Sequence, residues 1–592
     1  MRLRPARPIA RRGLAAILAT SLAAAVAIGL LLPPKALILR QPEWRPAGTS
    51  WRGAFHVHTN RSDGTGTIDE VAAAAARAGL QFVVLTDHGD GTRPLEPPSY
   101  RSGVLVIDGV EVSTTAGHYA AVGMRRAPYP LGGEARDVVE DVARLGGFGV
   151  ITHPDSPKGG QPWRDWAAPV DGMEWLNADT QWRDESTLRL ARAALAYPFR
   201  PPETLASLLN QGSLLARWDR AASVRPIVAL AGADAHARIG LEPTTREPYE
   251  GRALLRVPSY EASFRAFSLQ LVTAGPPSGR AADDAARVIE ALRAGRVHTV
   301  IDGWASPAVF EFTAKGGGQE AHEGGELATG EPVVLRVRSN APLYAALVLL
   351  RDGEEIQRVD RQSLVYATDR RGRYRVEVWL GRPGARPPIP WLVSNAITLR
   401  EPAPGGAGSG EAEGAGPRPA GAAEVSRPGG GAAGEQVSGP WHVEHDPRSG
   451  GEVAEGKDRG EIVLRFRLGG GRPSGQFAAL VAPIRVGGAS ALVFEARAAQ
   501  PMRVSVQLRA PAGREGERWH RSVYLDETPR QVRIRLDDMA PAGPTTSATP
   551  SRAVVDNLLF VVDTVNTAPG SVGTFEIARV RPEPGSPHPG KY

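Results

Sequence analysis

The chain has 592 residues, 42% of them hydrophobic, which is enough for several domains with full cores. Its net charge is +6, but residues 1–50 hold eight basic residues against one acidic residue, so the nearly neutral body offers no basic surface for nucleic acid. The absence of cysteine excludes disulfides, thiolate nucleophiles and cysteine-ligated metal sites.

The N-terminus combines positive charge with an apolar segment. Five arginines precede an uncharged run of 19 residues from Leu14 to Leu32. Roughly 20 such residues span a bilayer, and the arginines predict a cytoplasmic N-terminus. A cleaved signal peptide is the alternative, but the run is long and no clear cleavage site follows it. We favour a membrane anchor and stem over residues 1–50, with an extracytoplasmic body (secreted or periplasmic if the segment is cleaved).

Residues 51–240 alternate short apolar runs with alanine-rich helical stretches. Alternation of strands and helices predicts parallel strands in an α/β barrel or a doubly wound sheet. Residues 241–300 are predicted to be mainly helical. The seven runs that predict strands are Ala54–His58, Phe82–Asp87, Val104–Glu111, Tyr119–Met124, Phe148–His153, Val170–Trp175 and Ile227–Ala233.

The C-terminal half is predicted to be all-β. Residues 304–400 alternate like the strands of a small β-sandwich. Residues 401–438 contain no aromatic residue, Leu, Ile or Met, which predicts a flexible linker that leaves the last domain separately mobile. A second β domain follows over 439–583, and 584–592 form a tail.

Metal-ligating side chains lie at the ends of the predicted strands. All six histidines of residues 51–240 occur there. Parallel strands bring their carboxyl ends to one edge, so these side chains are expected to converge. Such a cluster is hard to pack without ions, and its size predicts two or three divalent ions, Zn, Mn or Fe. The nine candidates are His56, His58, Asp63, His88, Glu111, His118, His153, Asp234 and His236.

The segments HVHTNRSDG, TDH, GVEV, GH, THP and GADAH, in this order, resemble the PHP (polymerase and histidinol phosphatase) superfamily of metallohydrolases. The segment GRVHTVIDG (295–303) resembles its carbaryl-hydrolase-like branch, although His298 stands where tyrosine is usual. The resemblance covers 51–303 and implies a distorted (β/α)7 barrel with a trinuclear centre. It implies one ion held by His56, His58, Glu111 and Asp234, a second by Glu111, His118 and His153, and a third by Asp63, His88 and His236.

Four further residues are candidates near this centre. Asp87 is expected to accept a hydrogen bond from a ligand histidine or a backbone amide, or else to cap the turn after its strand. Arg61 is a candidate for catalysis and for gripping an anionic substrate. Lys158, in a glycine-rich loop, and Asn177, after the sixth strand, are further candidates for substrate binding.

The function favoured by the sequence is hydrolysis by a metal-bound hydroxide, with Glu111 bridging two ions. A small-molecule or envelope-derived phosphoester is the leading substrate, and a carboxylic ester or amide is the alternative. A surface glycan-binding protein with a scaffold barrel is the alternative of another class. The last domain is similar to jelly-roll carbohydrate-binding modules, in which Trp441 and Trp519 would stack on sugars or else lie in the core.

Overall fold

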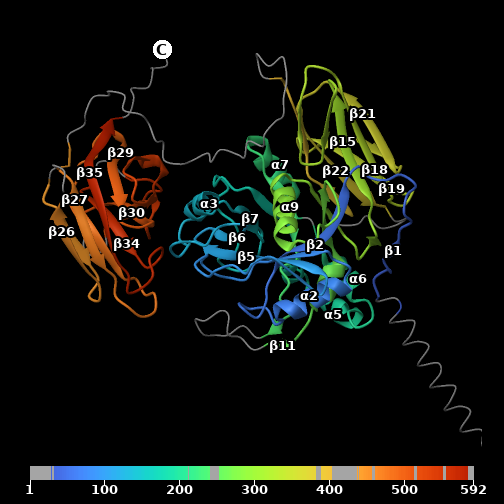
Figure 1. Cartoon of the computed structure of the whole chain (residues 1–592), viewed down its shortest axis with the longest axis horizontal. Coiled ribbons are helices and arrows are strands. Elements are labelled where there is room, and N and C mark those ends of the chain that lie inside the picture. The colour runs from blue at the N-terminus through green and yellow to red at the C-terminus, as the bar shows by residue number, and fades with distance from the viewer. Residues whose placement is uncertain are drawn as a thin grey trace, which may run out of the picture.

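The computed structural model shows a mixed α/β unit, a β unit joined to it and a C-terminal β domain (Figure 1). Nearly all of the predicted membrane anchor (14–32) and of the predicted linker lies outside the described residues. Within the described residues, no helix has the length and apolar character needed to cross a bilayer. These residues are 29, 32–210, 212–240, 253–381, 389–402, 436–437, 439–456, 460–511, 516–550 and 555–584.

The seven predicted strands of the α/β unit are confirmed and lie consecutively in one sheet. The sheet returns on itself, because the chain after the last strand bonds to the first: Ala233 N donates to Phe55 O at 2.8 Å and His58 N to Ala235 O at 3.1 Å. The strands are β2 (Thr49–Val57), β3 (Phe82–Leu85), β5 (Val104–Thr114), β6 (Gly117–Val122), β7 (Phe148–Thr152), β8 (Gly172–Asn177) and β9 (Val228–Gly232).

A side-chain cap marks the start of four helices of this unit. Thr67 and Glu70 form a capping box at the start of the first helix, each side chain accepting from the other's backbone N–H, at 3.2 and 2.8 Å. The helices are α2 (Ile68–Arg77), α3 (Ala135–Arg144), α4 (Ala178–Arg183), α5 (Thr187–Ala196), α6 (Pro201–Leu208), α7 (Leu214–Val224), α8 (Tyr260–Ala266) and α9 (Ala281–Arg293).

Two sequence expectations fail in this unit. Strand β6 runs antiparallel to both β5 and β7, so the sheet is not wholly parallel. The described part of the predicted mainly helical region contains three strands, β11 (Ala253–Leu255), β12 (Ser268–Thr273) and β13 (Val297–Val300), besides α8 and α9. Strand β12 pairs antiparallel with both β2 and β13, which extends the sheet beyond its closed part.

The β unit shares this sheet rather than packing as a separate body. Strand β23 pairs with β13, and one buried core runs through both units. Buried Asn395 reinforces the junction, since its Nδ2 donates to the carbonyls of Ala229 (2.9 Å) and Val297 (2.7 Å). Strands β17 (Glu326–Ala328), β19 (Ala345–Arg351), β20 (Glu354–Val359), β22 (Gly372–Leu380), β23 (Leu392–Ser394) and β24 (Ile397–Arg400) continue the sheet, opposite β15 (Phe310–Gly316), β16 (Gln319–His322), β18 (Val333–Ser339) and β21 (Ser363–Thr368).

Short strand pairs complete these two units. They are β1 (Leu37–Ile38) with β14 (Ala305–Ser306), β4 (Ser99–Arg101) with β5, and β10 (Ile239–Gly240) with β11 (Ala253–Leu255).

The C-terminal domain consists of two sheets around its own core. Trp519 is fully buried in that core and donates from Nε1 to Ser547 O at 2.9 Å, so it offers no platform for a sugar. Trp441 is half-buried against Phe560. One sheet contains β25 (His442–His445), β28 (Phe477–Pro483), β34 (Asn557–Asp563), β30 (Met502–Arg509), β31 (Arg518–Leu525) and β33 (Ala540–Pro541); the other contains β26 (Gly450–Glu455), β27 (Ile462–Arg467), β35 (Val572–Pro584), β29 (Ala489–Ala498) and β32 (Arg530–Arg535).

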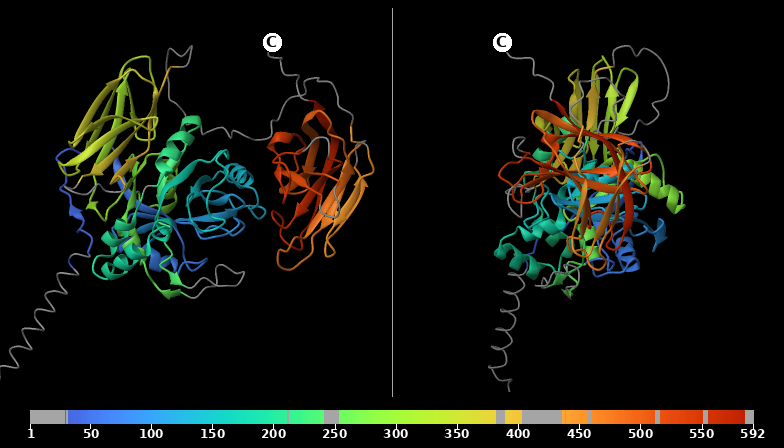
Figure 2. Two further views of the ribbon diagram at one scale, coloured as in Figure 1. Left: turned by 180° about the vertical axis from the view of Figure 1, so that it is seen from behind. Right: turned by 90° about the vertical axis from the view of Figure 1, so that its left-hand side faces the viewer.

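The C-terminal domain docks on α3, against the expectation of independent mobility. Arg503 is 1% exposed and donates to both carboxylate oxygens of Asp141, at 2.9 and 2.8 Å. It also pairs with Asp137 at 3.1 Å, and Arg521 pairs with Asp137 and Glu140. Figures 1 and 2 place this domain and the β unit on opposite sides of the α/β unit.

We expect Arg503→Ala to release the C-terminal domain from α3. The change leaves the carboxylates of Asp137 and Asp141 buried with less countercharge, and breaking such a pair costs about 3–5 kcal/mol. The radius of gyration in small-angle scattering should rise. Arg497→Ala, which removes a more exposed pair with Glu576 inside the domain, is the matched control. Equal radii of gyration for the two variants would show that the ion pairs of Arg503 do not hold the C-terminal domain on α3.

Candidate metal centre

The structure brings all nine candidate ligands together at one end of the closed sheet. His118 belongs to this cluster because antiparallel β6 begins, rather than ends, at that edge. Each of four groups offers ligand atoms within 4.8 Å of one another. The groups are His58, Asp63, His88 and His236; His56, His58 and Asp234; His56, Glu111 and His153; and His88, Glu111 and His118.

Glu111 lies at the middle of the cluster, contacting five of its six histidines. It is 1% exposed, and its Oε1 accepts from Thr152 Oγ1 at 2.6 Å. The carboxylate meets histidine nitrogens at 2.9 to 3.4 Å, which makes it the group best placed to contact more than one ion. These nitrogens belong to His56 (3.4 Å), His58 (3.3 Å), His88 (3.2 Å), His118 (3.3 Å) and His153 (2.9 Å).

Several ligand atoms are buried without a hydrogen bond. They include Nε2 of His56 and of His58, Oε2 of Glu111 and Nδ1 of His118. A buried polar atom without a partner is costly, and here four of them share one small space. Imidazole nitrogens and carboxylate oxygens are ligands for Zn, Mn and Fe(II). The donor set therefore fits divalent metal ions.

Three of the nine candidate ligands have a strained backbone conformation. His56, His153 and Asp234 have φ values of 65°, 32° and 43°. Non-glycine residues avoid this left-handed region, and such strain gathers at functional sites where the surrounding structure enforces it. The strands thus end in conformations that direct these side chains into the cluster.

The charges of the cluster oppose the effect of burial. Burial lowers the pKa of His58, but the carboxylates of Asp234 and Glu111, which lie 3.4 and 3.3 Å from its Nε2, outweigh burial and raise the pKa to about 10. Burial prevails at His88 and lowers its pKa to about 3. Neighbouring histidines hold the pKa of Glu111, Asp63 and Asp234 below the usual range despite burial. The cluster therefore presents three ionised carboxylates at neutral pH.

Glu174 on β8 is a site residue that the sequence analysis missed. It is fully buried, accepts from His56 Nδ1 at 2.6 Å through Oε1, and accepts from His153 N at 2.7 Å through Oε2. A carboxylate that engages one ring nitrogen of a histidine directs the other toward a metal. Its sequence signal was a charged residue inside the apolar run GMEWLN.

Asp87 and Arg61 support the turn that carries Asp63. Asp87 accepts from Thr59 N at 2.7 Å, one of the roles expected from the sequence, and from Ser62 Oγ at 2.8 Å. Arg61 donates to Asp87 at 2.8 Å and to Asp108 at 2.7 Å. The guanidinium is therefore tied to two carboxylates of the protein, which argues against the predicted grip on substrate.

We expect Arg61→Ala to weaken metal binding by about 10- to 100-fold, as loss of supporting groups around ligands does, with little change in KM. The reason is that buried Asp87 loses its countercharge and the turn to Asp63 loosens. Arg93→Ala is the control, because Arg93 pairs with Asp108 at 2.9 Å from a more exposed position. Metal titration and steady-state kinetics would decide; a raised KM with unchanged metal content would restore the substrate role.

Asn177, one of the predicted substrate-binding residues, is engaged within the protein. Asn177 is fully buried; its Nδ2 donates to Glu174 at 2.8 Å and its Oδ1 caps α4 by accepting from Thr180 N at 3.0 Å. It is thus a positioning residue. Lys158 lies exposed in the loop after β7, and its role in substrate binding stays a prediction.

Comparisons with known proteins give low similarity throughout. No family model matches the chain, and no curated protein matches it. A two-domain protein from Bacteroides vulgatus containing a predicted PHP-like metal-dependent phosphoesterase is 13% identical, covers 61% of this chain and 99% of its own, with a TM-score of 0.28.

Two further solved structures are similar at the same low level. An amidohydrolase from Chromobacterium violaceum is 17% identical over 34% of this chain and 91% of its own, with a TM-score of 0.21. A family 11 carbohydrate-binding module from Clostridium thermocellum is 14% identical over 27% of this chain and 100% of its own, with a TM-score of 0.22. At such identities and scores, none of these likenesses decides the fold or the function.

Proposed function

We propose that this protein is a metal-dependent hydrolase of the PHP type. The observation that carries the proposal is the largely buried cluster of nine metal-ligating side chains. In it, Nε2 of His56 and of His58, Oε2 of Glu111 and Nδ1 of His118 are buried without a hydrogen bond. A scaffold without chemistry would gain by replacing such atoms with apolar groups. This argues against the alternative of a glycan-binding surface protein.

The residues of this site have separable tasks in the proposed reaction. Divalent ions, when bound, supply Lewis acidity and lower the pKa of a water molecule toward neutrality. Glu111 provides the shared negative charge, because its two oxygens face different histidines. Glu174 orients His56, and Asp87 holds the turn before Asp63. We propose two or three ions of Mn, Zn or Fe, since the four ligand groups overlap in His56, His58, His88 and Glu111.

Phosphoester hydrolysis is the reaction that we propose first. Clustered dications suit a phosphoryl group because they neutralise the charge on both the attacking and the leaving oxygen. Carboxylic ester or amide hydrolysis is the second candidate, since the same site also polarises a carbonyl. The segment 295–303 supports placement in the carbaryl-hydrolase-like branch, with buried His298 held at 2.9 Å by Glu323 rather than among the ligands.

The cellular location is a proposal from the sequence alone. The arginines and the apolar run of residues 1–50 support an anchored protein with its body outside the cytoplasm. Protease treatment of intact cells should remove the body if this is right. A protein recovered intact from the cytoplasm would contradict it.

The proposed function is tested by measuring the metal content and the hydrolytic activity of the full chain, purified in detergent. After chelation and reloading with Mn, Zn or Fe, we expect two or three ions per chain and hydrolysis of generic phosphoesters above carboxylic esters. His118→Ala should lose an ion, whereas His445→Ala, at an exposed position in the last domain, should not. Fewer than two bound ions per chain would overturn the proposal. So would the absence of hydrolysis of every phosphoester and carboxylic ester tested.

A further inference from the structure

Helix α5 turns its leucines toward solvent rather than toward the core. Seven of its ten residues are exposed, and among them Leu188 is 82% and Leu195 is 61% exposed. These two leucines are seven positions apart and therefore share one face of the helix. Phe199, just after the helix, is 60% exposed. Single exposed apolar side chains are ordinary, but a helix with its apolar face outward indicates an interaction surface.

The segment that follows the predicted membrane anchor lies against the helix next to α5. Pro33, directly after the apolar run 14–32, accepts from Arg200 Nη1 through its carbonyl oxygen, and Ala36 N donates to Glu203 Oε1 at 3.3 Å. Arg200 and Glu203 lie at the start of α6, against which α5 packs. Figure 1 shows α5, α6 and β1 in the same part of the molecule. The exposed face of α5 therefore lies close to the end of the apolar run.

The charge of α5 suits an anionic lipid surface. The helix contains Arg189 and Arg192 and no acidic residue. Glu185, before the helix, pairs with Arg189, and Lys35 is exposed on the segment that leads from the apolar run. Helices that lie in the interface of a bilayer combine an apolar face with basic side chains, because the apolar face enters the acyl boundary and the cations meet lipid phosphates.

We infer that the exposed face of α5, together with Phe199, lies in the surface of an anionic lipid bilayer. The inference rests on the proposed location of the protein and adds a second membrane contact to the anchor. An anchor alone leaves the body free to turn about the segment that follows it. A second contact through Leu188 and Leu195 fixes the orientation of the body and removes their apolar surface from water.

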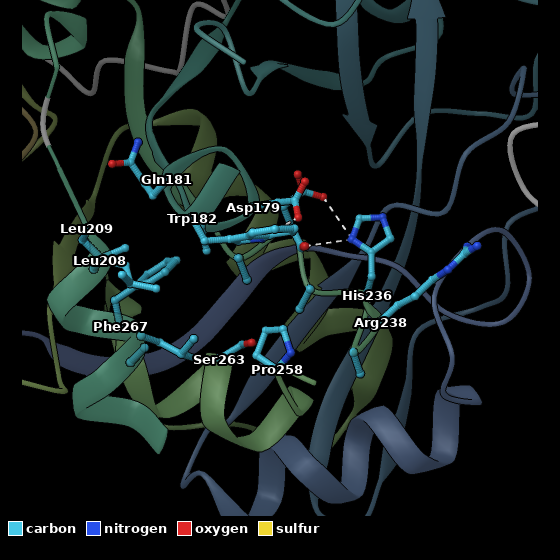
Figure 3. Close-up of a pocket in the computed structure, with 17 residues that line it drawn as sticks. Asp179, Gln181, Trp182, Leu208, Leu209, His236, Arg238, Pro258, Ser263 and Phe267 are labelled. Atoms are coloured by element: carbon cyan, nitrogen blue, oxygen red, sulfur yellow. Dashed lines mark hydrogen bonds and ion pairs between the residues drawn. The ribbon is translucent and has the colours of Figure 1, made fainter. Parts of the chain in front are cut away.

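This contact also determines where the metal centre lies. Helix α5 belongs to the connection between β8 and β9, whose other helices border the cluster. Figure 3 shows Trp182 of α4 between His236 and Leu208 of α6, and all three line one pocket. With α5 in the lipid surface, the end of the sheet that carries the ligands is held beside the membrane.

Spin labelling of the full chain tests the inference, since the sequence has no cysteine of its own. Leu188→Cys is labelled with a nitroxide in vesicles of phosphatidylcholine and phosphatidylglycerol. We expect the ratio of collisions with oxygen, which concentrates in lipid, to collisions with a water-soluble nickel complex to exceed one. Val224→Cys is the matched control, because Val224 is also 82% exposed on a helix. Its helix, α7, lies at the opposite end of the α/β unit (Figure 1), so its ratio should stay below one.

Two further comparisons separate the apolar from the charged contribution. Leu195→Glu, added to Leu188→Cys, should lower the collision ratio to that of the Val224→Cys control. Vesicles of phosphatidylcholine alone should also lower the ratio at position 188. A ratio unaffected by Leu195→Glu would overturn the inference, and one unaffected by the lipid charge would overturn the preference for anionic lipid.

A label in the apolar run distinguishes failure of the inference from failure of the proposed location. If Ala25→Cys places its label in lipid while Leu188→Cys places its label in water, the inference is overturned and the location stands. If both labels lie in water, the location fails and the inference fails with it. Dipolar coupling between the labels of two Leu188→Cys chains, without lipid contact, would show that a second copy covers the face and would also overturn the inference.

Discussion

Glu111→Gln is expected to deplete the metal centre and to lower turnover on the order of 10³-fold, equivalent to about 4 kcal/mol of transition-state stabilisation. The carboxylate of Glu111 faces five histidines from the middle of the cluster. Two dications held close together repel each other, and an anionic group between them offsets that repulsion. Glutamine keeps the shape of the side chain but loses the charge.

Elemental analysis of purified Glu111→Gln should show the loss of more than one ion per chain. Glu290→Gln, the same exchange at a 63% exposed position on α9, should keep the full metal content and activity. Circular dichroism would establish that both variants are folded. Wild-type stoichiometry and turnover in Glu111→Gln would rule out the bridging role and the model of several ions.

Gly232→Ala is expected to lower metal affinity and activity by about 10- to 100-fold, as loss of supporting groups around ligands does. A Cβ at Gly232 would lie 1.8 Å from Oε1 and 2.3 Å from Cδ of Glu174, so the carboxylate must move. Movement of Glu174 releases His56 Nδ1 and the backbone N–H of His153 together.

The pair of Gly232 and Glu174 allows a sharp control. Glu174→Asp alone shortens the side chain and withdraws it from His56, so it should also weaken metal binding. Combined with Gly232→Ala, the shorter side chain relieves the collision, so the double variant should be no worse than the worse single variant. Metal titration of the three proteins decides this. Additive losses would mean that Gly232 acts through something other than Glu174.

The candidate ligands could be predicted because their chemistry is local. Histidines and carboxylates at the ends of apolar runs need only the strand pattern to be brought to one edge. The antiparallel direction of β6 could also be predicted from the sequence. The runs ending at Glu111 and starting at Tyr119 are too close for a parallel crossover, which needs a dozen or more residues. The short connection forces β6 to run antiparallel and places His118 at the edge.

The supporting residues could not be assigned in the same way. The roles of Glu174 and Asn177 depend on which atoms their side chains reach at the end of β8. Alternation along a strand predicts only the face of the sheet on which a side chain lies. The pairing of Arg61 with Asp108, 47 positions away, has no local signal in the sequence. Docking of the last domain depends on Arg503 and Asp141, 362 positions apart, with no local pattern linking them.

The sheet shared by the α/β unit and the β unit has a consequence for synthesis on the ribosome. Strand β13 is complete long before β23 is translated, so until then the nascent chain carries an open sheet edge. Open edges pair readily with other chains and promote aggregation. Asn395, which joins β9 to β13 through its amide, also arrives only at this late stage. The nascent protein therefore exposes this edge until about residue 400 has emerged, and a chain terminated between β13 and β23 would keep it open.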